Sequence, residues 1–269
     1  MIARLRVVSA LGFLIGATLL LAPLQAVALK TGWWRETLIL KAWHRALLKG
    51  LGIRVHAAGA LSAQRPLLVA SNHLSWTDIL VLGSLADVNF IAKSELAGWP
   101  LLGWLSRLQR TVFIERERKR RSGDQASEIA TRLGKGDAMV LFAEGTTGDG
   151  NRLLPFKSTL FGAASMTTAE SKAEEVFIQP VAICYTRLHG VAFGRRDRHI
   201  ASWIGDEDLW PHALALLRER ALDVEVHFGE PVAFSNGSSR KEAARLVEKR
   251  VQAMMEIPLR DPRPALPRK

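Results

Sequence analysis

The polar residues from Ser71 to Asp78 are of types that can move a proton. They follow the apolar run Pro66–Ala70 and precede a second apolar run, Ile79–Leu85. A polar cluster between a strand and the helix after it is where open α/β sheets place their sites. A histidine such as His73 can take a proton from a hydroxyl group near neutral pH, because an unperturbed imidazole titrates at about pH 6.5.

A histidine that acts as a general base needs a carboxylate on its other ring nitrogen, to fix the tautomer and stabilise the imidazolium that forms. Asp78 is five positions after His73. That spacing does not put two side chains on one face of a continuous helix, but a loop histidine and a first-turn aspartate can meet if the chain folds back. The alternative is that Asp78 only complements the helix dipole and that His73 is an ordinary loop residue.

A glycine-rich loop from Glu144 to Gly150 follows the apolar run Ala138–Phe142. Backbone N–H groups of such a loop can bind an anionic or polar ligand, although a plain surface turn has the same composition. Arg116 follows another short apolar run, Thr111–Ile114. It is a candidate phosphate ligand, or simply the start of a solvated basic run.

The elements that must position these residues alternate between short β-rich runs and helical stretches, which predicts an α/β fold with a mostly parallel sheet flanked by helices. The expected strands are Arg54–Ala57, Pro66–Ala70, Val88–Ala92, Thr111–Ile114, Ala138–Phe142, Val176–Tyr185 and Val224–Phe228. The expected helices are Thr77–Leu85, Arg120–Leu133, Ser158–Thr168, Leu209–Arg220 and Arg240–Met255.

The N-terminal segment Val7–Leu29 is apolar and uncharged, and it is long enough to span a bilayer. A helix kinked at Pro23, or a signal peptide cleaved after Ala28, are the alternatives to a retained anchor. The next segment, Trp33–Lys49, mixes tryptophan and leucine with basic residues in a pattern that suits a helix lying in the membrane interface, or an ordinary core helix.

These patterns divide the chain into an anchoring helical pair over residues 1–52, an α/β domain over 53–257, and a basic, proline-rich tail over 258–269. The formal net charge of +11 favours anionic partners, either nucleic acid or an anionic lipid surface. Eight tryptophans against one tyrosine favour lipid. The single cysteine, Cys184, excludes an intrachain disulfide, and we find no convincing metal-ligand spacing.

Four segments together resemble the glycerolipid acyltransferase family, which includes the lysophosphatidic acid acyltransferases. They are Asn72-His73-x4-Asp78, Phe113–Arg116, Phe142–Thr146 and Ile178–Val181, in the family's order. The resemblance implies that the histidine is the general base, that the acyl donor is a thioester on coenzyme A or acyl carrier protein, and that an N-terminal helical pair sits on the cytoplasmic face of the bacterial inner membrane. It implies no other cofactor.

The same resemblance implies that Arg116 binds the acceptor's head group and that Glu144, Gly145 and Thr146 shape the acceptor site. Family members that make phosphatidic acid usually carry arginine after Glu-Gly-Thr, where this chain has Thr147. Arg152 or Lys157 can supply the missing charge, so a phosphate acceptor stays open. The remaining predicted substrate-binding residues are Thr147, Arg152 and Lys93.

The string from Glu144 to Arg152, with Trp203–Asp206 and Pro211-His212, looks like bacterial enzymes that acylate the hydroxyl of lyso-ornithine lipid. In that interpretation Asp149 faces the ammonium of the acceptor. The sequence therefore predicts an O-acyltransferase of lipid biosynthesis that acts on lyso-ornithine lipid, with lysophosphatidic acid as the alternative acceptor. The apolar stretch Trp99–Leu105 either lines the acyl chain site or contacts core or membrane.

Two other classes of protein compete with this prediction. One is a basic membrane-binding or nucleic-acid-binding protein without catalysis, but aromatic residues are not interleaved with the basic run as base stacking requires. The other is a hydrolase that uses Ser71 or Ser75 with His73, but the chain has no Gly-x-Ser-x-Gly elbow. We therefore expect membrane lipids and an acyl thioester as partners, and no nucleic acid. The oligomeric state is left open.

Overall fold

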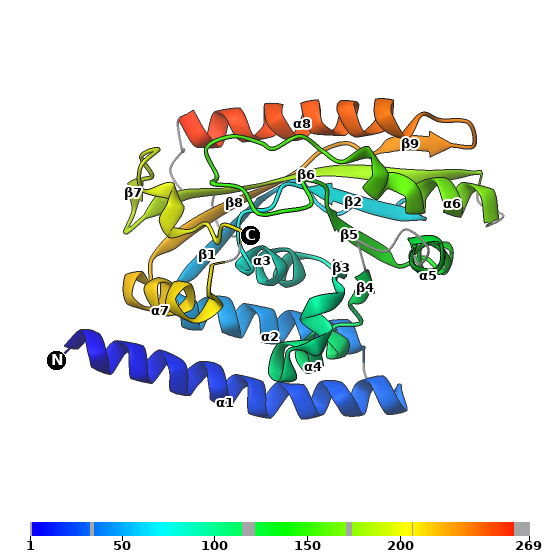
Figure 1. Ribbon diagram of the computed structural model, residues 1–269. Coiled ribbons are helices and arrows are strands. Elements are labelled where there is room, and N and C mark those ends of the chain that lie inside the picture. Colours follow the sequence, from blue (N-terminus) through cyan, green and yellow to red (C-terminus); the bar gives the residue numbers. More distant parts are fainter. Residues whose placement is uncertain (1, 33–34, 115–121, 171–173, 206, 261–269) are drawn as a thin grey trace.

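The computed structural model describes residues 2–32, 35–114, 122–170, 174–205 and 207–260 of the 269-residue chain. Within these residues, nine strands form one sheet that lies between two groups of helices (Figure 1). Seven strands follow one another across the sheet in the order β1-β8-β6-β2-β5-β3-β4, and β7 and β9 pair with β6. The strands are β1 (Ile53–Ala58), β2 (Leu67–Ser71), β3 (Asn89–Lys93), β4 (Val112–Ile114), β5 (Ala138–Phe142), β6 (Glu175–Leu188), β7 (Val191–Ala192), β8 (Leu222–Phe228) and β9 (Val232–Ser235).

The sheet is mostly parallel, which confirms the predicted fold class. β2 runs parallel to both of its neighbours, β5 and β6, and every residue of β2 and β5 is buried. Burial on both faces explains why these strands read as continuous apolar runs. Only the pairs that β6 makes with β7, β8 and β9 are antiparallel in the described sheet.

Alternate residues of β2 face two separate hydrophobic cores, as the period of a strand requires. Leu67 and Val69 pack with residues of α2, α3 and α7, whereas Leu68 and Ala70 pack with residues of α5, α6 and α8. The helices are α1 (Ile2–Thr31), α2 (Glu36–Leu51), α3 (Thr77–Leu85), α4 (Pro100–Leu108), α5 (Ser122–Gly134), α6 (Gly162–Glu170), α7 (Leu209–Glu219) and α8 (Arg240–Arg260), with short 3-10 turns η1 (Ser94–Gly98), η2 (Ser158–Phe161) and η3 (Arg198–Ile200).

The N-terminal helices form a layer at the base of the molecule, on the side of the sheet away from α8 (Figure 1). α1 continues through Pro23, and of the described helices it alone is long and apolar enough to cross a membrane. Much of its apolar surface faces outward, since Leu5, Leu19 and Leu20 are 70%, 71% and 66% exposed. The helix therefore associates the protein with a membrane.

α2 packs between α1 and the sheet domain. Its Gly50 allows close approach, because a Cβ there would lie 2.5 Å from Cδ2 of Leu14 in α1. Gly52 then ends α2 in the left-handed conformation, with φ of 73°, which favours glycine. The predicted change of pattern at Gly52 thus coincides with the end of the helical pair.

Several elements differ from their predictions. β7, β9 and α4 were not anticipated, and the helix expected at Ser158–Thr168 divides into η2 and α6. The expected tail begins at Pro258, but α8 continues to Arg260 and Pro258 is buried within it. Some predictions fall on residues outside the described part of the chain. They are the start of α5 at Arg120, the ligand Arg116, and the interfacial residues Trp33 and Trp34.

Candidate active site

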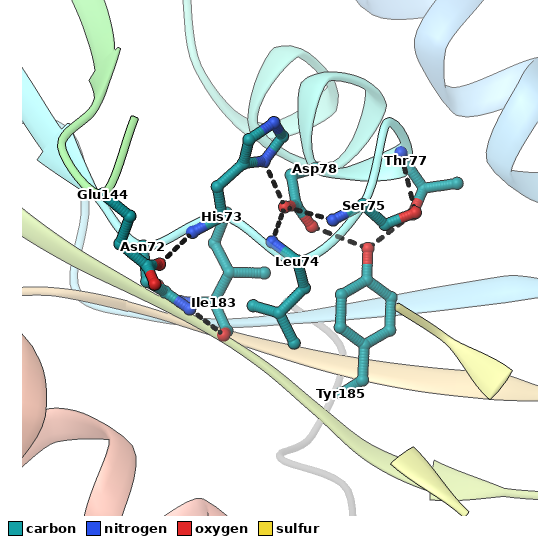
Figure 2. A network of polar contacts seen from close by, with 9 residues as sticks. All are labelled: Asn72, His73, Leu74, Ser75, Thr77, Asp78, Glu144, Ile183 and Tyr185. Carbon is teal, nitrogen blue, oxygen red and sulfur yellow. Dashed lines mark hydrogen bonds and ion pairs between the residues drawn. The ribbon is translucent and has the colours of Figure 1, made fainter. Parts of the chain in front are cut away.

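The site forms where β2 and β5 end beside the longer β6. The main-chain ladder between β2 and β5 extends by one bond, from the Ala143 amide to the Ser71 carbonyl at 2.9 Å. Toward β6, the Asn72 side chain takes the place of further main-chain pairing. It exchanges two hydrogen bonds, of 2.8 and 2.9 Å, with the backbone of Ile183 (Figure 2). These bonds fix the point at which the chain leaves the sheet and turns toward α3.

The loop between β2 and α3 brings His73 and Asp78 together. His73 Nδ1 lies 2.8 Å from Oδ2 of Asp78, which is fully buried (Figure 2). The same oxygen accepts the backbone N–H groups of Leu74 at 2.7 Å and Ser75 at 2.9 Å. The loop residues just before α3 therefore wrap around the carboxylate, and this is how the chain folds back over five residues.

Tyr185 completes the environment of Asp78 from β6. Its hydroxyl donates to Asp78 Oδ1 at 2.8 Å and lies 2.5 Å from Oγ1 of Thr77, which can donate to it in turn. Burial and the negative charge of Asp78 raise the pKa of Tyr185 well above its ordinary value, so the phenol stays a donor. Tyr185 is the only tyrosine of the chain, and sequence reasoning did not assign it to the site.

The His73 ring is held on its face as well as on its edge. It stacks on Phe142 with ring centroids 3.8 Å apart and planes 11° apart. Since the Asp78 carboxylate accepts from Nδ1, the neutral ring carries its proton on Nδ1 and leaves Nε2 to accept one. Nε2 points away from Asp78 (Figure 2), and none of the described residues forms a hydrogen bond with it. This arrangement leaves Nε2 able to accept a proton, and Phe142 can stabilise the positive charge of a protonated ring.

Glu144 ties this loop to the segment that follows β5. Its two carboxylate oxygens accept the backbone N–H of His73 at 2.7 Å and of Leu154 at 2.9 Å. Burial raises the pKa of Glu144 to about 7, although both hydrogen bonds oppose the rise. Both oxygens are occupied inside the protein, so in this structure Glu144 positions His73.

The glycine-rich loop packs tightly around these residues. Gly145 adopts φ of 73°, and a Cβ there would lie 2.9 Å from Cδ and 3.0 Å from Nζ of Lys157. Of the two cations considered as replacements for the missing arginine, Lys157 therefore lies against the Glu-Gly-Thr turn. Gly148 donates its N–H to the His73 carbonyl at 2.8 Å, so the loop also holds the main chain of the histidine.

The other predicted substrate-binding residues lie around this centre. Thr147 is half-buried, whereas Thr146, Arg152 and Lys93 are exposed. Lys93 ends β3, whose parallel pairing with β5 puts it at the same edge of the sheet as the site. Asp149 accepts the backbone N–H of Asn151 at 3.0 Å and so stabilises its own turn.

The described residues contain no group of three or more His, Cys, Asp and Glu side chains placed to hold a metal ion. The features that are present are a His–Asp pair at the carboxyl edge of an α/β sheet and a helical layer that associates with a membrane. This combination is typical of a membrane-associated α/β enzyme.

The chain belongs to the acyltransferase family and is an acyl-transfer enzyme. The family model described as Acyltransferase matches residues 52–184, which include the whole His–Asp loop and the Glu-Gly-Thr turn. The lyso-ornithine lipid O-acyltransferase of Brucella abortus is 49% identical over 96% of this chain and 97% of its own length. The enzyme of the same name from Rhizobium meliloti is 47% identical over 92% of this chain and 85% of its own length.

A solved structure has the same fold. The crystal structure of the 1-acyl-sn-glycerophosphate acyltransferase PlsC from Thermotoga maritima superposes with a TM-score of 0.65. The match covers 94% of this chain and 96% of the other, at 21% sequence identity. At that identity the likeness establishes a common fold.

Proposed function

We propose that the protein transfers a fatty acyl group from a thioester to the free hydroxyl of lyso-ornithine lipid. The names of the two relatives, each nearly half identical over most of the chain, support this acceptor. Thr147, which stands where enzymes that make phosphatidic acid usually carry arginine, supports it as well. In this proposal residues 1–52 anchor the enzyme and residues 53–257 carry catalysis.

The His73–Asp78 contact of 2.8 Å is the single observation that carries the mechanism. His73 Nε2 takes the proton of the acceptor hydroxyl while that oxygen attacks the thioester carbonyl carbon. The carbon–sulfur bond then breaks, and the imidazolium returns its proton to the thiolate that leaves. Asp78 holds the ring and stabilises its positive charge between these steps.

The oxyanion that forms on the thioester carbonyl needs N–H donors that are free to reach it. The amides of Leu74 and Ser75 donate to Asp78, and those of Gly145 and Gly148 donate to carbonyl groups of the site. We assign the oxyanion to the remaining amides of the turn, those of Thr146 and Thr147.

The acyl donor in this proposal is a thioester of acyl carrier protein or coenzyme A, and the site faces the cytoplasm, where such donors are made. Both carriers are acidic, which suits a chain with a net charge of +11. Exposed basic groups near the carboxyl edge of the sheet, such as Lys93 and Arg152, are candidates to attract the donor.

The test uses the purified full-length protein in detergent with lyso-ornithine lipid or lysophosphatidic acid as acceptor, each paired with acyl-CoA and with acyl carrier protein. We expect consumption of lyso-ornithine lipid, and loss of transfer in His73→Ala. His189→Ala, which removes an exposed histidine paired with Glu219 at 3.0 Å, is the matched control and should keep full activity. Preferential use of lysophosphatidic acid would contradict the acceptor, and full turnover by His73→Ala would contradict the mechanism.

A further inference from the structure

The outer face of α4 presents apolar side chains to solvent next to the N-terminal helix. Leu101 and Trp104 are 63% and 43% exposed, and Trp99, which precedes the helix, is 45% exposed. Leu101, Trp104 and the exposed Arg107 are three residues apart, so they share one stripe of the helix. A stripe of this composition is unusual on a surface that faces only water.

The side of α4 that carries Leu105 and the C-terminal end at Leu108 fix this stripe in place. Leu105 is buried in a cluster with Ala22 of α1 and Trp43 of α2. Gln25 of α1 donates its side-chain N–H to the carbonyl of Leu108 at 3.2 Å. α4 is therefore docked directly on α1, and the two helices lie together at the base of the molecule (Figure 1).

η1 and α4 also form a tight unit. A Cβ on the buried Gly103 would lie 2.5 Å from the carbonyl oxygen of Ala97 in η1, so glycine permits the two segments to touch. Arg107 donates to the same carbonyl at 3.0 Å. Because α4 is held to α1 and α2 on one side and to η1 on another, its exposed side chains project from a rigid support.

We propose that the stripe of Leu101, Trp104 and Arg107, together with Trp99, is a second membrane contact that inserts into the interface of an anionic bilayer. The first reason is continuity, because α4 adjoins the part of α1 in which Leu20, Leu24 and Val27 are themselves exposed. The second is chemistry, because tryptophan favours the boundary between head groups and acyl chains and arginine favours anionic head groups.

This contact would set the orientation of the domain on the membrane rather than strengthen its attachment. α1 by itself is long enough to hold the protein on the membrane, but a single helix leaves the attached domain free to rotate about it. A second contact, on α4, fixes which side of the domain faces the lipid. Since α4 lies between β3 and β4, the carboxyl edge of the sheet would be held in one orientation to the bilayer.

The test measures where α4 lies in reconstituted vesicles of phosphatidylethanolamine and phosphatidylglycerol. Nitroxide labels are placed on full-length Leu101→Cys and Trp104→Cys, with Leu19→Cys of α1 as the bilayer reference. Leu246→Cys is the matched control, since Leu246 is a 41% exposed leucine of α8 on the far side of the sheet. The natural Cys184 is buried and burial raises its pKa, so it does not compete for the label.

Labels at positions 101 and 104 should collide with oxygen several-fold more often, and with a water-soluble nickel chelate several-fold less often, than the label at 246. Chelate access at 101 and 104 as high as at 246 would overturn the proposal. So would spin–spin broadening at 101 that disappears on mixing with unlabelled protein, because that result would identify a second copy of the chain as the occupant.

Discussion

Glu144 makes the protein less stable as the pH rises. A salt-bridged acid, whose pKa is lowered on folding, has the opposite effect. Burial raises the pKa of this carboxyl from 4.5 to about 7 in the folded protein. The folded state therefore binds the proton more tightly than the unfolded state does. The stability gained from that proton is fully present below pH 4.5 and is lost as the pH rises through 7, and its size is about 3 kcal/mol.

Glu144→Gln removes this titration and keeps the size of the side chain. We expect the free energy of unfolding of the wild type, relative to the variant, to fall by about 3 kcal/mol between pH 4 and pH 8. When wild type and variant are measured in the same detergent, this corresponds to a fall of roughly 6–12 °C in the melting temperature of the wild type relative to the variant, for a chain of this length.

Glu175→Gln controls for the loss of one negative charge, because Glu175 is exposed at the start of β6. Its difference from the wild type should be the same at both pH values. A difference between wild type and Glu144→Gln that also stays constant with pH would refute the argument that desolvation dominates at Glu144.

Three further substitutions and one control test the residues that support His73. Asp78→Asn replaces an acceptor of three N–H groups and one hydroxyl, so kcat should fall about 10³-fold or more in a transfer assay. Tyr185→Phe removes one bond to a carboxylate, which should cost about 1.5–3 kcal/mol in denaturant unfolding and lower kcat several-fold at unchanged KM; an unchanged kcat would make Tyr185 merely structural. Gly145→Ala and Gly190→Ala both put a side chain at positive φ and should each cost about 1–2 kcal/mol. Only the former crowds Lys157, so only it should slow transfer, and equal rates would contradict the role of the loop.

The core of the fold could be predicted because its signals are local. β5 and α3 have the bounds that their apolar runs indicated, since a strand buried on both faces and a helix that begins just after a polar loop leave clear boundaries. α4 was missed, because it is only nine residues long and contains Pro100 and Gly103, two residue types that more often mark turns than helices. β9 was missed because it is only four residues long and pairs with a distant segment of the chain.

The site divides in the same way. The types and order of His73, Asp78 and Glu144 could be read along the chain, but their partners could not. Tyr185 reaches Asp78 across a separation of 107 residues. Glu144 is hydrogen-bonded to backbone groups, which every residue carries, so no side-chain pattern marks its partners.

The solitary Tyr185 gives this enzyme a built-in reporter. Because the chain contains one tyrosine and its hydroxyl is hydrogen-bonded to Asp78, protein grown with 3-fluorotyrosine would show a single fluorine resonance that arises entirely from the site. The chemical shift of that resonance would follow the charge on the neighbouring His73–Asp78 pair as acceptor lipid binds. The eight tryptophans spread over the chain offer no comparable signal.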